Sequence, residues 1–84
     1  MSQATQALER MLDPVRDVLT TDVAAALADL RADAKTQALL DDLAHRNTAG
    51  QLTPDERAEY ELLVAAGNVI AVLQAKARAF LRKR

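Results

Sequence analysis

Apolar side chains recur at helical spacing through the last third of the chain. From Leu62 to Leu81 they follow one another at intervals of three and four residues, which places them on one face of an α-helix. Pro54 suits a first helical position, Thr53 before it is a good N-cap, and Glu56 completes a capping box. The pattern predicts one long helix over residues 54–82, about 43 Å in length.

A second amphipathic helix is predicted just upstream. Leu39, Leu40 and Leu43 share a helical face, Asp33 offers an N-cap, and Gly50 can take the left-handed conformation that ends a helix. We therefore expect a helix over 33–49, which forms a hairpin with helix 54–82.

The first third of the chain gives weaker signals. Thr20 or Thr21 can cap a helix over 21–31, which would pack across the long helix. Pro14 cannot stand inside a continuous helix, so Asp13 and Pro14 are interpreted as a cap and a first helical position after a separate helix over 3–12.

The fold class expected from these patterns is all-α, because no stretch alternates between apolar and polar residues as a strand would. We expect a single helical domain over residues 19–84 and a less defined helical segment over residues 1–18.

Length and the absence of cysteine predict a partner subunit. A chain of 84 residues buries a small core, and this one has no cysteine for a disulfide. The long helix extends about 18 Å beyond helix 33–49. The overhang, residues near 71–82, is apolar, and helix 21–31 covers only one side of it. A second copy is expected to cover the rest, in an antiparallel, two-fold homodimer.

The interface expected for that homodimer follows a seam of residues on the long helix. Gly67 would permit close approach and Gln74 would fix the register. The full predicted set is Tyr60, Leu63, Gly67, Ile70, Leu73, Gln74, Ala77, Phe80 and Leu81.

Charge is distributed unevenly along the chain. Residues 1–61 hold all twelve acids and six bases, net −6, whereas residues 62–84 hold five bases and no acid. Antiparallel pairing would bring the basic end of one long helix near the acidic first turns of the other. Acids at the start of a helix and bases at its end also complement the helix dipole without any partner. The alternative is a nucleic-acid contact through the five bases, Lys76, Arg78, Arg82, Lys83 and Arg84.

Catalytic chemistry is not expected. The single serine, Ser2, and the single histidine, His45, cannot form a catalytic triad. Asp41 and Asp42 point about 100° apart on a helix and do not converge on one ion. We predict no catalytic residue, no cofactor and no metal site. The chain also shows neither a signal peptide nor an uninterrupted apolar stretch of about 18 residues, so a cytoplasmic protein without a membrane contact is expected.

Two blocks of the sequence resemble a widespread group of small, uncharacterised bacterial proteins. The blocks run from Leu43-Ala44 through Asn47, Gly50, Leu52-Thr53 and Glu59-Tyr60, and then from Ile70 to Arg78 through Leu73-Gln74 and Lys76-Ala77. The resemblance covers about residues 19–82 and implies a bacterial source. Some genes of this group neighbour genes for HNH nucleases, so the resemblance implies an antitoxin-like or accessory partner of a nuclease as one alternative role.

The function expected from the residues is a non-enzymatic protein–protein interaction module that associates with itself. A nucleic-acid-binding accessory protein is the alternative that the basic C-terminal turn supports. The two differ in salt dependence, because phosphate contacts weaken steeply with added salt and an apolar interface does not.

Overall fold

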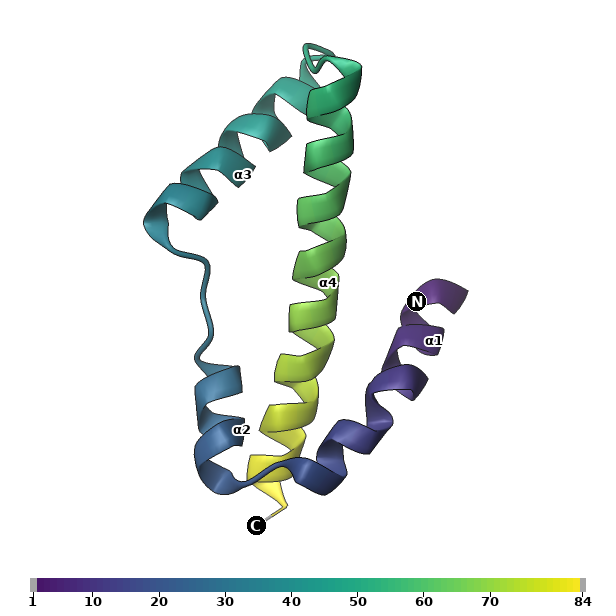
Figure 1. Ribbon diagram of the computed structural model, residues 1–84, viewed down its shortest axis with the longest axis vertical. Coiled ribbons are helices and arrows are strands. Elements are labelled where there is room, and N and C mark those ends of the chain that lie inside the picture. Colours follow the sequence, from purple (N-terminus) through teal and green to yellow (C-terminus); the bar gives the residue numbers. More distant parts are fainter. Residues whose placement is uncertain (1, 84) are drawn as a thin grey trace. The chain divides into compact units, whose positions relative to one another are not determined.

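The computed structural model describes residues 2–83, and within that range the protein is all-α (Figure 1). In chain order the elements are α1 (Gln3–Leu12), the 3₁₀-helix η1 (Asp13–Val18), α2 (Thr21–Ala28), α3 (Ala34–Thr48) and α4 (Pro54–Arg82). No strand occurs among the described residues. The expected fold class is confirmed.

The junction between α3 and α4 has the predicted local structure. The Thr53 hydroxyl accepts a hydrogen bond from the Glu56 N–H at 3.2 Å, and the Glu56 carboxylate accepts one from the Thr53 N–H at 3.1 Å. Gly50 has φ of +72°, a value that strains side chains with a Cβ. Asp33 caps α3 by accepting from the Thr36 N–H at 2.6 Å. These devices explain why both helices begin and end within a residue of the predicted bounds.

The N-terminal elements differ from the prediction in two places. Helix α2 is capped by Thr20 but ends at Ala28 rather than at residue 31, and Leu30 donates its N–H to the Leu27 carbonyl, 3.2 Å away. Pro14 lies in the first turn of η1, as expected, but Asp13 forms no cap, because its carboxylate bonds to Lys76 instead.

Contacts divide the chain into two compact units. The terminal unit contains the residues up to Leu30 and those from Asn68 onward; the hairpin unit is Arg31–Gly67. Helix α4 thus contributes its second half to the terminal unit and its first half to the hairpin unit. In this division the N-terminal segment groups with α2 and the second half of α4. The expected domain boundary at residue 18 stays a prediction.

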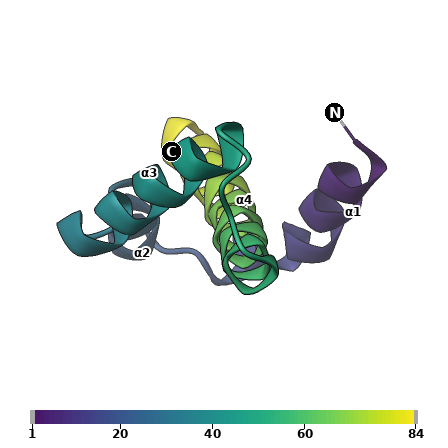
Figure 2. The same ribbon diagram turned by 90° about the horizontal axis from the view of Figure 1, so that it is seen from above.

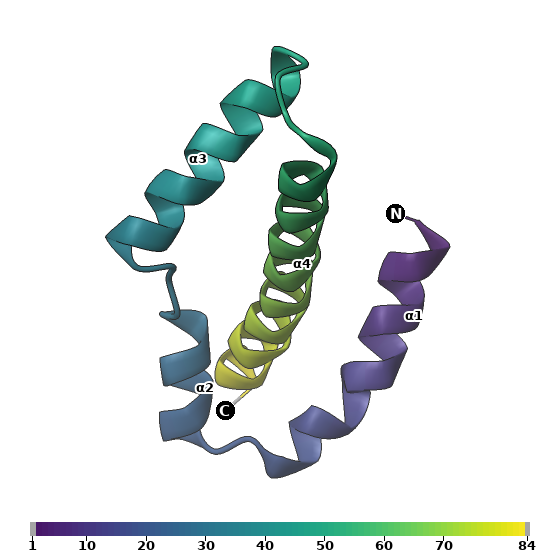
Figure 3. The ribbon, with the colours of Figure 1, turned by 45° about the horizontal axis from the view of Figure 1, so that its top comes forward.

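The core of the terminal unit is centred on one leucine and two alanines. Leu19, Ala24 and Ala77 are buried, and half-buried residues pack around them from η1, α2 and α4: Val15, Leu27, Ala28, Phe80 and Leu81. In Figures 1 and 3, α2 lies on one side of the second half of α4, and η1 leads to α1 on the other side. Two short elements therefore flank one long helix.

The hairpin unit has a much smaller core. Leu43 of α3 is its one large side chain that is fully buried among the described residues, with 1% of its surface exposed. Figures 1 and 2 show α3 leading away from the first turns of α4 beyond the connecting loop. The helical hairpin that the sequence predicted is present, and the ion pair of Arg46 with Glu56 joins its two helices next to the loop.

Candidate interaction surfaces

An ion pair between Lys76 and Asp13 joins α4 to η1. The Lys76 ammonium lies 2.6 Å from the Asp13 carboxylate. Lys76 is buried, with 7% of its surface exposed, whereas the Asp13 side chain is open to solvent. The hydrogen bond from Lys76 is the main reason that the pKa of Asp13 is lowered, and the nearby charge of Arg16 adds to the effect. Sequence reasoning missed this pair, since its members are 63 positions apart.

Gln74 joins α4 to the end of α2. Its side-chain amide donates to the Leu30 carbonyl at 2.7 Å and to the Leu27 carbonyl at 3.2 Å. Carbonyl groups at the end of a helix have no partner within that helix, and the Gln74 amide supplies a donor there. The sequence prediction placed Gln74 in a seam between two copies, but the structure uses it inside one chain.

The predicted overhang of the long helix is covered within the chain. Ala77 is fully buried, and Phe80 and Leu81 pack against the same core. The prediction that only a second copy can bury this stretch is therefore wrong for Ala77, because η1 packs together with α2 around the end of α4. The prediction counted α2 alone as a cover within the chain.

The remaining residues of the predicted seam lie further towards the start of α4. Tyr60, Leu63 and Leu73 are half-buried, and Gly67 is exposed with no atom near its Cα that a Cβ would meet. Ile70 is 37% exposed. Of the nine predicted interface residues, those before residue 71 keep the accessibility that an interface requires, most clearly Gly67 and Ile70.

Polar contacts hold the hairpin unit together at its loop. The Arg46 guanidinium lies 2.7 Å from the Glu56 carboxylate and 3.1 Å from that of Asp42. The Thr53 N–H, followed by Arg46, lowers the pKa of Glu56, and Glu56 in turn raises the pKa of Arg46. The Glu56 carboxylate thus completes the N-terminal cap of α4 and also binds α3 through Arg46.

The hairpin unit leaves large apolar side chains in solvent. Leu62 on α4 is 70% exposed, and Leu39 and Val64 are more than 40% exposed. Leu62 and Val64 are two positions apart and point about 200° from each other around the helix. The unit therefore has an apolar surface on more than one side.

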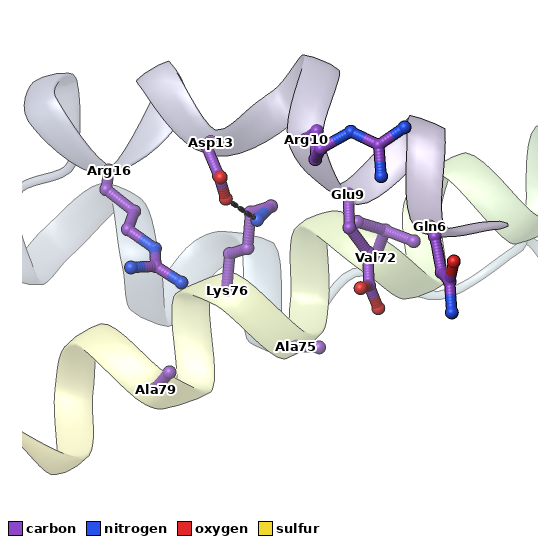
Figure 4. A pocket seen from close by; sticks show the side chains of 9 residues that line it. All are labelled: Gln6, Glu9, Arg10, Asp13, Arg16, Val72, Ala75, Lys76 and Ala79. Carbon is purple, nitrogen blue, oxygen red and sulfur yellow. Dashed lines mark hydrogen bonds and ion pairs between the residues drawn. The ribbon is translucent and has the colours of Figure 1, made fainter. Parts of the chain in front are cut away.

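A groove with more cations than acids lies between α1 and η1 on one side and the second half of α4 on the other (Figure 4). Its larger part, of about 430 Å³, is lined by Gln6, Glu9, Arg10, Asp13, Arg16, Val72, Ala75, Lys76 and Ala79. A second hollow of about 310 Å³ is lined by Arg16, Lys76, Ala79, Phe80 and Lys83. Figure 4 shows Arg16 reaching from η1 towards α4, on the opposite side of the Asp13–Lys76 pair from Arg10 and Glu9.

The five bases expected to contact nucleic acid are not equivalent. Arg78, Arg82 and Lys83 are exposed. Lys76 is buried and paired with Asp13, so in this structure it is not presented to a phosphate. Arg84 lies outside the described residues. Arg16, which the prediction did not include, adds a cation beside Lys83.

The acids and the histidine considered for chemistry lie apart. Asp41 accepts a hydrogen bond from Gln37, Asp42 pairs with Arg46, and His45 is exposed. Within residues 2–83 no group of three or more His, Cys, Asp or Glu side chains is placed to hold a metal ion.

By length and composition α4 could cross a membrane. Its most apolar 18-residue window has a mean hydropathy of 1.3, and 17% of that window is buried. The run without charge, from Leu62 to Ala75, is only about 21 Å long, compared with a hydrocarbon core of about 30 Å. Because soluble helices pass the same test, this is weak evidence, and the expected location of the protein stays a prediction.

Comparison with known proteins gives no identification: no family model, no curated protein and no solved structure matches this chain. The resemblance to small bacterial proteins therefore stays a prediction.

Proposed function

We propose that the protein is a non-enzymatic interaction module that associates with itself and binds other proteins through the hairpin unit. The observation that carries this proposal is the exposure of Leu62, 70% of whose surface is open to solvent beside a core with one fully buried large side chain. Burying a leucine side chain is favourable by about 1.5–3 kcal/mol. A second protein surface is the means by which this unit can bury Leu62.

The surface proposed here differs from the one that the sequence predicted. At the end of α4, η1 and α2 bury Ala77, so each copy, as proposed, supplies apolar side chains from the first half of α4 to the homodimer. Leu62 and Ala66 are exposed there and lie four residues apart, on one face of the helix. Neither belongs to the nine residues of the predicted seam.

Light scattering over a range of concentrations tests the proposal. The wild-type protein is expected to increase in mass towards that of a dimer, and Leu62→Asp is expected to stay monomeric. Val64→Asp is the matched control, since Val64 is also exposed but points to the other side of α4. A wild-type protein that remains monomeric at about 1 mM, or equal effects of the two substitutions, would contradict self-association through this face.

A second candidate function is nucleic-acid binding, which the exposed cations Arg78, Arg82 and Lys83 favour. Binding through phosphate contacts would weaken steeply with salt, with a slope of log K against log [salt] close to −0.9 per phosphate neutralised. Titration of a short DNA duplex at several salt concentrations measures that slope. A slope near zero would contradict this candidate.

A further inference from the structure

The hollow of about 310 Å³ in the terminal unit combines unpaired cations with an apolar wall. Arg16 comes from η1 and Lys83 directly follows the end of α4, while Phe80 and Ala79 form the apolar part. Lys76 also lines the hollow, but its charge is balanced by Asp13 at 2.6 Å. Within residues 2–83, neither the Arg16 guanidinium nor the Lys83 ammonium makes a hydrogen bond or an ion pair. The hollow therefore carries two cations without a direct ion-pair partner, and Asp13, which Lys76 binds, is the acid close enough to Arg16 for their charges to interact.

This combination selects for an acidic partner with an apolar group beside its charge. A free phosphate would use the cations alone. An occupant that also places an apolar side chain against Phe80 would bury apolar area in addition to pairing charges.

The hairpin unit of the same chain carries a surface with those properties. Asp55, Glu59 and Leu62 follow one another at spacings of four and three residues, so they lie on one face of α4. All three are exposed. Neither carboxylate makes a hydrogen bond or an ion pair within the described part of the chain, in contrast to Glu56, which Arg46 and Thr53 hold.

We propose that the hollow receives the Asp55–Glu59–Leu62 face of a second copy of this chain, with Arg16 and Lys83 bound to the carboxylates and Leu62 against Phe80. This inference rests on the proposed self-association and assigns it a specific contact. Each chain carries both the hollow and the acidic face, so a two-fold pair uses every surface twice. The uneven distribution of charge along the sequence then gives attraction between chains, because Asp55 and Glu59 of one copy meet Arg16 and Lys83 of the other.

Two charge-reversed proteins test the contact. The first carries Arg16→Glu and Lys83→Glu, and the second carries Asp55→Lys and Glu59→Lys. In each protein alone the hollow and the face have the same sign, so self-association should weaken at least about tenfold, because like charges brought together in an interface are strongly unfavourable. Mixed in equal amounts, the two should form a heterodimer, since each hollow then meets a face of opposite sign. Sedimentation equilibrium measures both, and circular dichroism checks that each variant keeps its helices.

A matched control separates the contact from general attraction between oppositely charged proteins. Arg78→Glu with Arg82→Glu changes the net charge by the same amount, but neither residue lines the hollow. This control should still self-associate, and it should bind the Asp55→Lys, Glu59→Lys protein more weakly than the hollow variant does.

Three results would overturn the inference. If the wild-type protein associates and both reversed proteins associate equally well, the hollow is not the contact, although self-association stands. If the control binds the acid-reversed protein as tightly as the hollow variant does, net charge is the cause. If the hollow variant keeps its association but loses binding to a DNA duplex, the cations serve nucleic acid. A wild-type protein that stays monomeric would instead contradict the proposed function itself.

Discussion

The terminal unit and the hairpin unit share helix α4, but different interactions hold them together. In the terminal unit two short elements pack on α4 around Ala24 and Ala77, which are fully buried, and two polar side chains of α4 bind η1 and α2. In the hairpin unit Leu43 is fully buried. The capping box of Thr53 and Glu56 and the ion pair of Arg46 with Glu56 add polar contacts near the loop. Apolar exposure on the first half of α4 thus follows from the number of elements that pack against it.

The comparison also explains where a partner would bind. On α4 itself, the flanked second half buries Ala77, whereas a two-helix hairpin cannot enclose both of its helices and leaves Leu62 exposed. The exposed apolar side chains Met11 and Val18 of the terminal unit lie on its N-terminal elements. In the proposed homodimer, the hairpin unit supplies the Leu62 face and the terminal unit supplies the charged hollow.

The largest effect is expected at the core of the hairpin unit. Leu43→Ala removes its fully buried side chain and should lower the free energy of unfolding by about 2–5 kcal/mol. Leu39→Ala on the exposed side of α3 is the control and should change it by less than about 1 kcal/mol. Hydrogen exchange followed by mass spectrometry should show the loss of protection in α3 first. Equal loss in α2 would mean that the two units unfold as one.

The next effect concerns the tight core of the terminal unit. Ala24 has no exposed surface and packs in the cluster with Ala77, so Ala24→Leu should destabilise by about 1–3 kcal/mol through overpacking. Its neighbour Ala25 is exposed, and Ala25→Leu should be nearly neutral. Urea denaturation compares the two variants. Tolerance of leucine at position 24 would show that the terminal unit is packed loosely.

A smaller effect is expected at the loop of the hairpin unit. Gly50 has a positive φ, and a Cβ there would meet no atom within 4 Å. Gly50→Ala should therefore cost about 1–2 kcal/mol, from backbone conformation alone. Gly67 in α4 also has room for a Cβ, and Gly67→Ala should stabilise by up to about 1 kcal/mol. Thermal unfolding of the two variants should shift the midpoint in opposite directions.

The smallest effect is expected from a decrease in pH, which should lower the melting temperature through one carboxylate in each unit. The pKa of Asp13 is lowered in the terminal unit and that of Glu56 in the hairpin unit. A carboxyl group with a lowered pKa stabilises the folded state above its ordinary pKa of about 4, and this contribution is lost as the pH falls through the lowered value. The melting temperature should therefore decrease below about pH 4.

Substitution separates the two carboxylates in that experiment. Glu56→Gln keeps a residue that suits a capping box but no longer titrates, so its melting temperature should fall less between pH 6 and pH 3 than that of the wild-type protein. Asp13→Asn should have a similar effect through the terminal unit. An unchanged acid dependence in both variants would show that neither carboxylate contributes.

The sequence predicted the elements with local signals better than it predicted their packing. The bounds of α3 and α4 follow from Asp33, Gly50 and Thr53, each of which acts within a few residues. Carbonyl groups at the early end of α2 bind Gln74, more than forty positions away, and periodicity carries no information about such a contact.

The candidate surfaces were predicted only in part for the same reason. The seam on α4 combined positions that face η1 and α2 with positions that stay exposed, because spacing identifies a helix face but not what covers it. Lys76 was grouped with the surface bases, since its aspartate partner lies in a different element. The role of α4 as the centre of the fold was nevertheless evident from its length.

The links between α4 and the N-terminal elements also set an order of assembly. Asp13 must meet Lys76 across 63 positions, whereas Arg46 meets Glu56 across ten. Short loops close at a lower entropic cost than long ones, and a chain is synthesised from its N-terminus. On the ribosome α1, η1 and α2 therefore emerge well before the part of α4 that buries them. The hairpin of α3 and α4 can therefore form first, and the N-terminal elements pack against α4 last.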